Sequence, residues 1–184
     1  MKDFTPVYIP AGVPTFHLES AKAQFEASAE LLRSIDAGFA VPDDMLLSID
    51  ALDAFLGSVQ PDLVVFQNLT FANSAYISAV MRRVSCPILL WTLREPVIDG
   101  GRLRLNSLTG AYSAANAMRA FGGRRFEYVF GAPDEERVRE VISASVSAAR
   151  LIKDMRSLRM SAVGHTPQGF GFGRALDAEL MSVF

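Results

Sequence analysis

The chain has 184 residues, of which half are hydrophobic and 21% are charged, and its formal net charge is −2. This composition is typical of one globular domain, and the scattered basic residues argue against a nucleic-acid partner. No apolar run approaches the ~18 residues that span a bilayer, and the N-terminus does not resemble a signal peptide, so no membrane partner is expected. Cys86 is the single cysteine, which makes a reducing cytoplasm the expected location.

Short apolar segments alternate with longer segments of helical periodicity along the chain. Strands are predicted, in chain order, at 5–10, 38–42, 62–66, 87–93, 125–131 and 159–164. Helices are predicted between them, at 17–35, 48–59, 73–84, 107–121 and 133–158. Ser48 is the expected N-cap of the second helix, and Pro133 should occupy the first position of the last one.

The regular alternation of strand and helix is the pattern of a parallel sheet covered by helices on both faces. We therefore expect an α/β protein with a doubly wound parallel sheet, arranged as a flavodoxin-like three-layer sandwich over the first five strands. Sheets of this kind bind ligands at the carboxyl ends of their strands.

A glycine-rich loop near the end of the chain invites comparison with nucleotide-binding loops. Three glycines alternate there with phenylalanine, at Gly169, Gly171 and Gly173. The spacing fits neither a dinucleotide fingerprint nor a P-loop, and no lysine follows to reach a phosphate. A surface loop is the favoured interpretation.

The residues offer little support for catalysis or metal binding within this chain. His17 and His165 are the two histidines, and no pair of His or Cys has the spacing of a zinc site. Cys86 precedes a buried strand, at the end of the sheet opposite to the expected site, and no nucleophile elbow is present. We predict no catalytic residue and no metal ligand here.

Polar and aromatic side chains do gather after the predicted strands. The candidate substrate-binding residues are Gln67, Thr70, Phe71, Glu95, Asn106, Ser107 and Thr109. Amides and hydroxyls can hydrogen-bond the hydroxyl groups of a sugar, while an aromatic ring covers its apolar face. Helix capping explains some of these residues equally well. Residue types alone therefore favour neither a sugar site nor a purely structural role.

The stretch from 61 to 131 resembles the N-terminal domain of the L-fucose isomerase and L-arabinose isomerase superfamily. The shared order is a buried strand, Thr70-Phe71, a helix, a strand led by Pro87 that ends near Glu95-Pro96, and then Asn-Ser-x-x-Gly opening a helix at 106–110. The close of the chain, 161–184, resembles the start of that family's second domain. The resemblance thus divides the chain into a flavodoxin-like domain, 1–158, and the first strand, loop and partial helix of another α/β domain, 159–184.

This resemblance implies the N-terminal portion of a cytoplasmic aldose–ketose isomerase, an intramolecular oxidoreductase of carbohydrate metabolism. Family members hold a divalent metal, usually Mn²⁺, in later domains, so no cofactor and no activity are expected of this chain alone. Its implied contribution is homo-oligomer contact and part of the sugar pocket of a neighbouring subunit. In that pocket Phe71 matches an aromatic, and Asn106, Ser107 and Thr109 fall at polar positions.

Two departures from the family patterns concern the identity of the sugar. Some fucose isomerases have Arg-Pro-Thr after the first strand, where this chain has Val13-Pro14-Thr15, and the arabinose enzymes have a histidine at the position of Thr109. These differences favour a divergent, fucose-isomerase-like member that acts on an aldose or ketose. The alternative is a stand-alone flavodoxin-like module that binds a sugar or serves in assembly.

Overall fold

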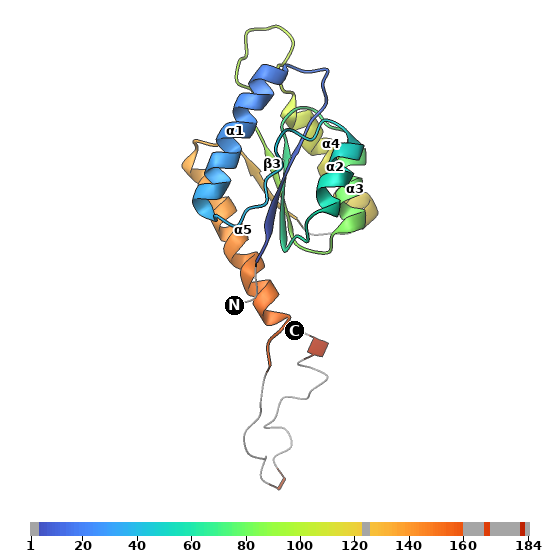
Figure 1. The fold of residues 1–184 in the computed structure, drawn as a ribbon, viewed down its shortest axis with the longest axis vertical. Helices are drawn as coiled ribbons and strands as arrows, with labels where there is room; N and C mark the ends of the chain where they lie inside the picture. Colours follow the sequence, from blue (N-terminus) through green and yellow to red (C-terminus); the bar gives the residue numbers. More distant parts are fainter. Residues whose placement is uncertain (1–3, 123–125, 160–167, 170–180, 183–184) are drawn as a thin grey trace.

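The computed structural model describes residues 4–122, 126–159, 168–169 and 181–182 (Figure 1). Within these residues it contains four strands and five helices. In chain order they are β1 (Pro6–Ala11), α1 (Leu18–Ile35), α2 (Ile49–Gly57), β2 (Leu63–Asn68), α3 (Ser74–Arg83), β3 (Ile88–Thr92), α4 (Ser107–Gly122), β4 (Glu127–Phe130) and α5 (Glu136–Met155).

The four strands form one parallel sheet in the order β1-β2-β3-β4. Two single-residue bridges, at Ala40 and Leu46, extend the sheet beyond β1 and are also parallel to it. The backbone N–H of Tyr8 donates to the carbonyl of Ala40 at 3.0 Å, and the N–H of Leu46 donates to Pro10 at 2.9 Å. The segment after α1 therefore lies outside β1, which is the flavodoxin order of a doubly wound sheet.

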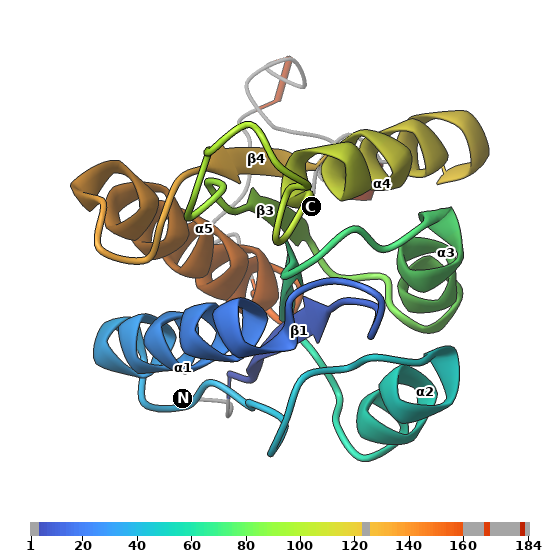
Figure 2. The same cartoon turned by 90° about the horizontal axis from the view of Figure 1, so that it is seen from above.

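Helices cover both faces of the sheet, with α1 and α5 on one side and α2, α3 and α4 on the other (Figure 2). Successive side chains of a strand point to opposite faces, and both faces of the central strands are buried. In β2, Val65 packs in the cluster formed with α1 and α5, whereas Val64 and Phe66 pack in the cluster formed with the other three helices. This arrangement confirms the expected α/β three-layer sandwich.

None of the described helices has both the length and the apolar character needed to cross a bilayer.

Helix starts follow the predicted local chemistry in most cases. The Ser48 hydroxyl accepts a hydrogen bond from the Ala51 N–H at 3.1 Å, as an N-cap does, and the Asn73 side chain caps α3 in the same way. His17 caps α1, because its Nδ1 accepts from the Ser20 N–H at 3.2 Å. The polar residue expected in the loop after the first strand is therefore a helix cap.

Two predicted boundaries are wrong. The strand expected at 38–42 is reduced to the bridge at Ala40, because Pro42 has no N–H to continue the ladder. The last helix begins at Glu136, so Pro133 is not its first residue. A turn precedes this helix, in which the Glu135 carboxylate accepts from the Ala132 N–H at 2.7 Å. The strand expected at 159–164 and the partial helix after it fall almost entirely outside the described residues, so the second domain stays a prediction.

Candidate functional site

The loops that follow β1, β2 and β3 meet at the carboxyl edge of the sheet, where the sequence predicts a site. Hydrogen bonds join each of the three loops to the other two. The Val13 N–H donates to the Thr70 hydroxyl at 2.8 Å, the Phe71 N–H to the Leu105 carbonyl at 2.8 Å, and the His17 N–H to the Arg104 carbonyl at 3.0 Å. The edge is therefore held as one connected surface.

Thr70 and Phe71 have different roles in this surface. Thr70 is fully buried and its hydroxyl holds the loop after β1. Phe71 is half-buried, and its ring centroid lies 6.3 Å from that of Phe16. Two aromatic rings from neighbouring loops thus lie side by side at the edge.

Glu95 organises the long loop between β3 and α4. Its carboxylate accepts hydrogen bonds from three successive backbone N–H groups, those of Arg104 at 2.6 Å, Leu105 at 2.9 Å and Asn106 at 3.0 Å. An ionised carboxylate makes strong hydrogen bonds of this kind. Glu95 therefore closes the loop on itself and positions the residues that precede α4.

Ser107, the first residue of α4, ties that helix to two strands. Its hydroxyl donates to the Asn68 carbonyl at 2.5 Å and accepts from the Leu93 N–H at 2.9 Å. The side chain is buried. Ser107 therefore fixes the start of α4 against the carboxyl ends of β2 and β3.

Asn106 and Thr109 present polar groups at the outer side of the same helix start. The Thr109 hydroxyl donates to the Asn106 side-chain oxygen at 2.7 Å, and Thr109 is exposed. Asn106 has a φ of 52°, the left-handed conformation that asparagine tolerates better than most residues. This backbone turn directs the chain from the loop into α4.

Gln67 is placed differently from the other predicted site residues. It is fully buried within β2, where the Tyr8 hydroxyl donates to its side-chain oxygen and its side-chain nitrogen donates to the Ser28 hydroxyl at 3.0 Å. Burial raises the pKa of Tyr8 far above its usual range, so the phenol keeps the proton it donates. Both polar atoms of Gln67 thus have partners within the chain.

The predicted residues accordingly form two groups. Phe71, Asn106 and Thr109 are exposed or half-exposed, and the last two bond to each other. The polar atoms of Gln67, Thr70, Glu95 and Ser107 bond to other parts of the chain. Internal bonds of this kind shape and stiffen the edge. The contact of any of the seven residues with a sugar stays a prediction.

Two buried polar side chains at this edge were not singled out from the sequence. Asn68 ends β2 and Thr92 ends β3; they are register partners, and both are fully buried. The amide atoms of Asn68 and the hydroxyl of Thr92 have no hydrogen-bond partner among the described residues. A polar residue closing an otherwise apolar strand was the available signal, since buried polar groups are normally paired.

A charged pair, Arg94 and Glu135, joins the loops that follow β3 and β4. The Arg94 guanidinium makes two hydrogen bonds to the Glu135 carboxylate, at 2.5 and 3.0 Å. The Arg94 hydrogen bonds, aided by the Ala132 N–H, lower the pKa of Glu135, while the same pairing raises the pKa of Arg94.

In the described part of the chain, no three side chains of His, Cys, Asp or Glu gather as a metal ion would require. This part alone therefore provides no fit for a Mn²⁺ ion.

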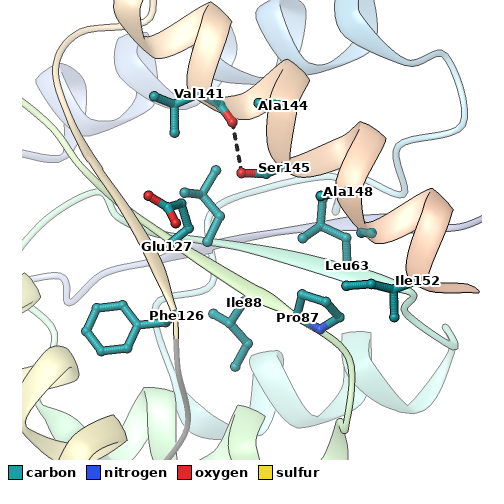
Figure 3. Close-up of a pocket in the computed structure, with 12 residues that line it drawn as sticks. Leu63, Pro87, Ile88, Phe126, Glu127, Val141, Ala144, Ser145, Ala148 and Ile152 are labelled. Atoms are coloured by element: carbon teal, nitrogen blue, oxygen red, sulfur yellow. Dashed lines mark hydrogen bonds between the residues drawn. The ribbon is translucent and has the colours of Figure 1, made fainter. Parts of the chain in front are cut away.

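An apolar groove of about 420 Å³ lies at the opposite end of the sheet. It opens between α5 and the first residues of the strands, and its floor includes Leu63, Ile88 and Phe126 (Figure 3). Ala148 and Ile152 of α5 line its wall (Figure 3). The groove has few polar groups to orient a sugar, and it is remote from the loops described above.

The order of the strands and the helices on both faces define the class to which the chain belongs, the doubly wound α/β proteins of flavodoxin-like arrangement. Within that class, the chain is 61% identical over all 184 residues to a sulfoquinovose isomerase of a Clostridium species. It is also 35% identical to that of Priestia megaterium over 99% of its length and 36% identical to that of Alkalicoccus urumqiensis over 98%.

The chain spans only about 41% of the length of the first of these relatives. No family model matches the sequence. Among solved structures, an azoreductase from Bacillus anthracis aligns over 83% of this chain and 100% of its own, at 14% identity and a TM-score of 0.34. That score is too low to carry an argument.

Proposed function

We propose that this chain is the N-terminal portion of a longer sugar isomerase, a ketol-isomerase that interconverts an aldose and a ketose, with sulfoquinovose as its aldose. The observation that carries the proposal is the 61% identity, over the whole of this chain, to a protein named sulfoquinovose isomerase. The resemblance to the fucose and arabinose isomerase superfamily supports the same reaction type.

In this proposal the chain supplies one wall of a sugar pocket. The half-exposed ring of Phe71 offers an apolar surface. Asn106 and Thr109 offer hydrogen-bonding groups at the start of α4, next to Leu105, whose carbonyl accepts the Phe71 N–H. The Mn²⁺ ion and the carboxylates that move the proton belong to later parts of the polypeptide. The chain also contributes contacts between the subunits of a homo-oligomer, and the enzyme is cytoplasmic.

The direct test compares the 184-residue chain with the longer protein encoded by the same gene. Each is incubated with Mn²⁺ and sulfoquinovose, and the appearance of the ketose is followed by NMR. We expect turnover by the longer protein and none by the chain above a metal-only blank. Turnover by the chain, or a gene that stops at codon 184, would overturn the proposal.

A stand-alone flavodoxin-like module that binds a sugar is the second candidate, favoured by the edge being well ordered by its own hydrogen bonds. It requires a sugar to raise the melting temperature of the 184-residue chain without Mn²⁺, because a ligand that binds only the native state stabilises it. A module used in assembly alone would show no such shift, and its oligomeric state in native mass spectrometry would be independent of sugar.

A further inference from the structure

Arg102 is an exposed cation that the structure holds in one place. Its guanidinium carbon lies 4.9 Å from the centroid of the Phe16 ring, and its Nη2 donates to the Thr15 carbonyl at 3.1 Å. A guanidinium over an aromatic face is attracted by the ring. Because an arginine has five N–H donors, these two contacts leave most of them unused.

No carboxylate neutralises Arg102 among the described residues. Three other arginines in the described part of the chain have such a partner, Arg83 with Asp53, Arg94 with Glu135 and Arg150 with Asp36. The acid nearest to Arg102 along the loop, Asp99, accepts a hydrogen bond from the Gly101 N–H at 2.9 Å. Arg102 thus offers a positioned positive charge with open donors.

The loop that carries Arg102 is held shortly after this residue. Glu95 accepts the N–H groups of Arg104 and Leu105, two and three positions after Arg102. The carbonyl groups of the same two residues accept from His17 and Phe71. A side chain on such a support loses less conformational freedom when it binds a ligand, which favours affinity.

Arg102 also continues the proposed sugar wall. Its guanidinium covers Phe16, and the Phe16 ring lies 6.3 Å from the ring of Phe71. A sugar lying on Phe71 would therefore be next to Phe16, which has the Arg102 guanidinium over its ring.

We infer that Arg102 and Phe16 form the subsite that recognises the sulfonate of the sugar, an inference that rests on the function proposed above. Sulfoquinovose carries its sulfonate on carbon 6, whereas an aldose–ketose conversion takes place at carbons 1 and 2. A sulfonate stays ionised at any physiological pH and presents three oxygens, which the planar fork of an arginine can match.

The experiment uses the longer protein and two sugars that differ in the sulfonate alone, sulfoquinovose and 6-deoxyglucose. For Arg102→Gln we expect KM for sulfoquinovose to rise by about 10-fold to 100-fold, the usual loss for a charged hydrogen-bonded pair, with little change in kcat. The constants for 6-deoxyglucose should stay as they are in the wild type. Arg102→Lys keeps the charge without the fork and should recover part of the loss.

Arg82→Gln is the matched control, since Arg82 is an exposed arginine in the last turn of α3, away from the carboxyl edge. It should behave as the wild type toward both sugars. Equal losses toward both sugars for Arg102→Gln would show a purely structural role, and no loss would remove the subsite; either result overturns the inference.

Failure of the proposed function has a different signature, namely a wild-type protein that converts neither sugar. Calorimetric titration then decides the subsite independently of turnover. The subsite requires sulfoquinovose to bind more tightly than 6-deoxyglucose, and Arg102→Gln to abolish that difference. Equal binding of the two sugars, or no binding, overturns the inference as well.

Discussion

Asn68 and Gly110 show how closely the end of β2 packs against the first turns of α4. A Cβ atom at position 110 would lie 2.7 Å from the Asn68 side-chain nitrogen and 3.1 Å from the Ala72 backbone nitrogen. Such distances require the neighbours to move, so Gly110→Ala should lower the free energy of unfolding by about 1–3 kcal/mol. Urea denaturation measures the change.

The control for this substitution is Gly57→Ala at the end of α2, where an added Cβ meets nothing within 4 Å. This variant should be neutral or more stable by up to about 1 kcal/mol, because alanine loses less backbone entropy on folding. Equal stability of the two variants would contradict the close approach of α4 to Asn68.

The buried pair of Tyr8 and Gln67 provides a second prediction for single residues. Tyr8→Phe leaves the Gln67 side-chain oxygen without its donor in a fully buried position. An unsatisfied buried acceptor costs about 1–3 kcal/mol, which a urea unfolding curve will show. Tyr112→Phe, at a tyrosine that is 69% exposed, should leave the stability unchanged. A neutral Tyr8→Phe would mean that the hydrogen bond contributes nothing.

At the scale of elements, Glu95 governs the loop between β3 and α4. Glu95→Gln replaces a carboxylate that serves three N–H groups with an amide that has one acceptor oxygen. We expect faster hydrogen exchange at residues 104–106, since their amides lose protection. Glu127→Gln, at an exposed residue of β4, should not alter it. Unchanged exchange in both variants would show that the loop is held by its other contacts.

The link between the loop after β3 and the start of α5 should be sensitive to acid. Arg94 holds the pKa of Glu135 below its usual range, so the folded state favours the ionised carboxylate. This stabilisation is present above the usual glutamate pKa of about 4.3 and is lost as the pH falls below it toward the lowered value. Both side chains are partly exposed, so the effect is small and weakens in salt.

Glu135→Gln tests this sign directly through melting temperatures recorded between pH 7 and pH 3. The variant should be less stable than the wild type at pH 7, and the difference should shrink as the pH falls. Arg94→Gln should show the same convergence, because it removes the partner that lowers the pKa. A difference that is constant with pH would contradict the assignment.

The elements were predictable from the sequence because their signals are local. Apolar runs marked the four strands, and Ser48 marked the start of α2. The predicted strand at 38–42 was wrong because Pro42 has no N–H to continue the pairing with β1 past the bridge at Ala40. The start of α5 was wrong because the Glu135 side chain closes a turn after Pro133.

The candidate site was predictable in its place but not in the use of its atoms. Residues after parallel strands must meet at one edge, so the meeting of Thr70, Phe71 and Ser107 follows from topology. Which polar atoms stay free depends on distant partners, such as Tyr8 for Gln67, 59 positions away. Arg102 could not be identified from the sequence for the same reason, since the Thr15 carbonyl that accepts its hydrogen bond is 87 positions away.

At the scale of the whole molecule, the expected occupant of the apolar groove on α5 is polypeptide that follows residue 184 in the proposed longer isomerase. Ile152 lines the groove and α5 ends soon after, at Met155, so the C-terminal end of this helix lies beside the groove. Leu151 and Leu158 nearby are more than half exposed, and the relatives are more than twice as long as this chain. Apolar surfaces of this kind mark sites of interaction, and the extra length of the relatives favours polypeptide as the occupant.

Cysteine labelling can test this occupant because Cys86 is the single cysteine and is buried. Ser145 lines the groove, whereas Ser147 is exposed on the same helix and does not line it. Ser145→Cys should react with a bulky maleimide in the 184-residue chain and be protected in the longer protein, and Ser147→Cys should react in both. Equal reaction of Ser145→Cys in both proteins would leave the groove uncovered. Protection that rises with the concentration of the 184-residue chain would instead identify a second copy as the occupant, and the prediction would be wrong.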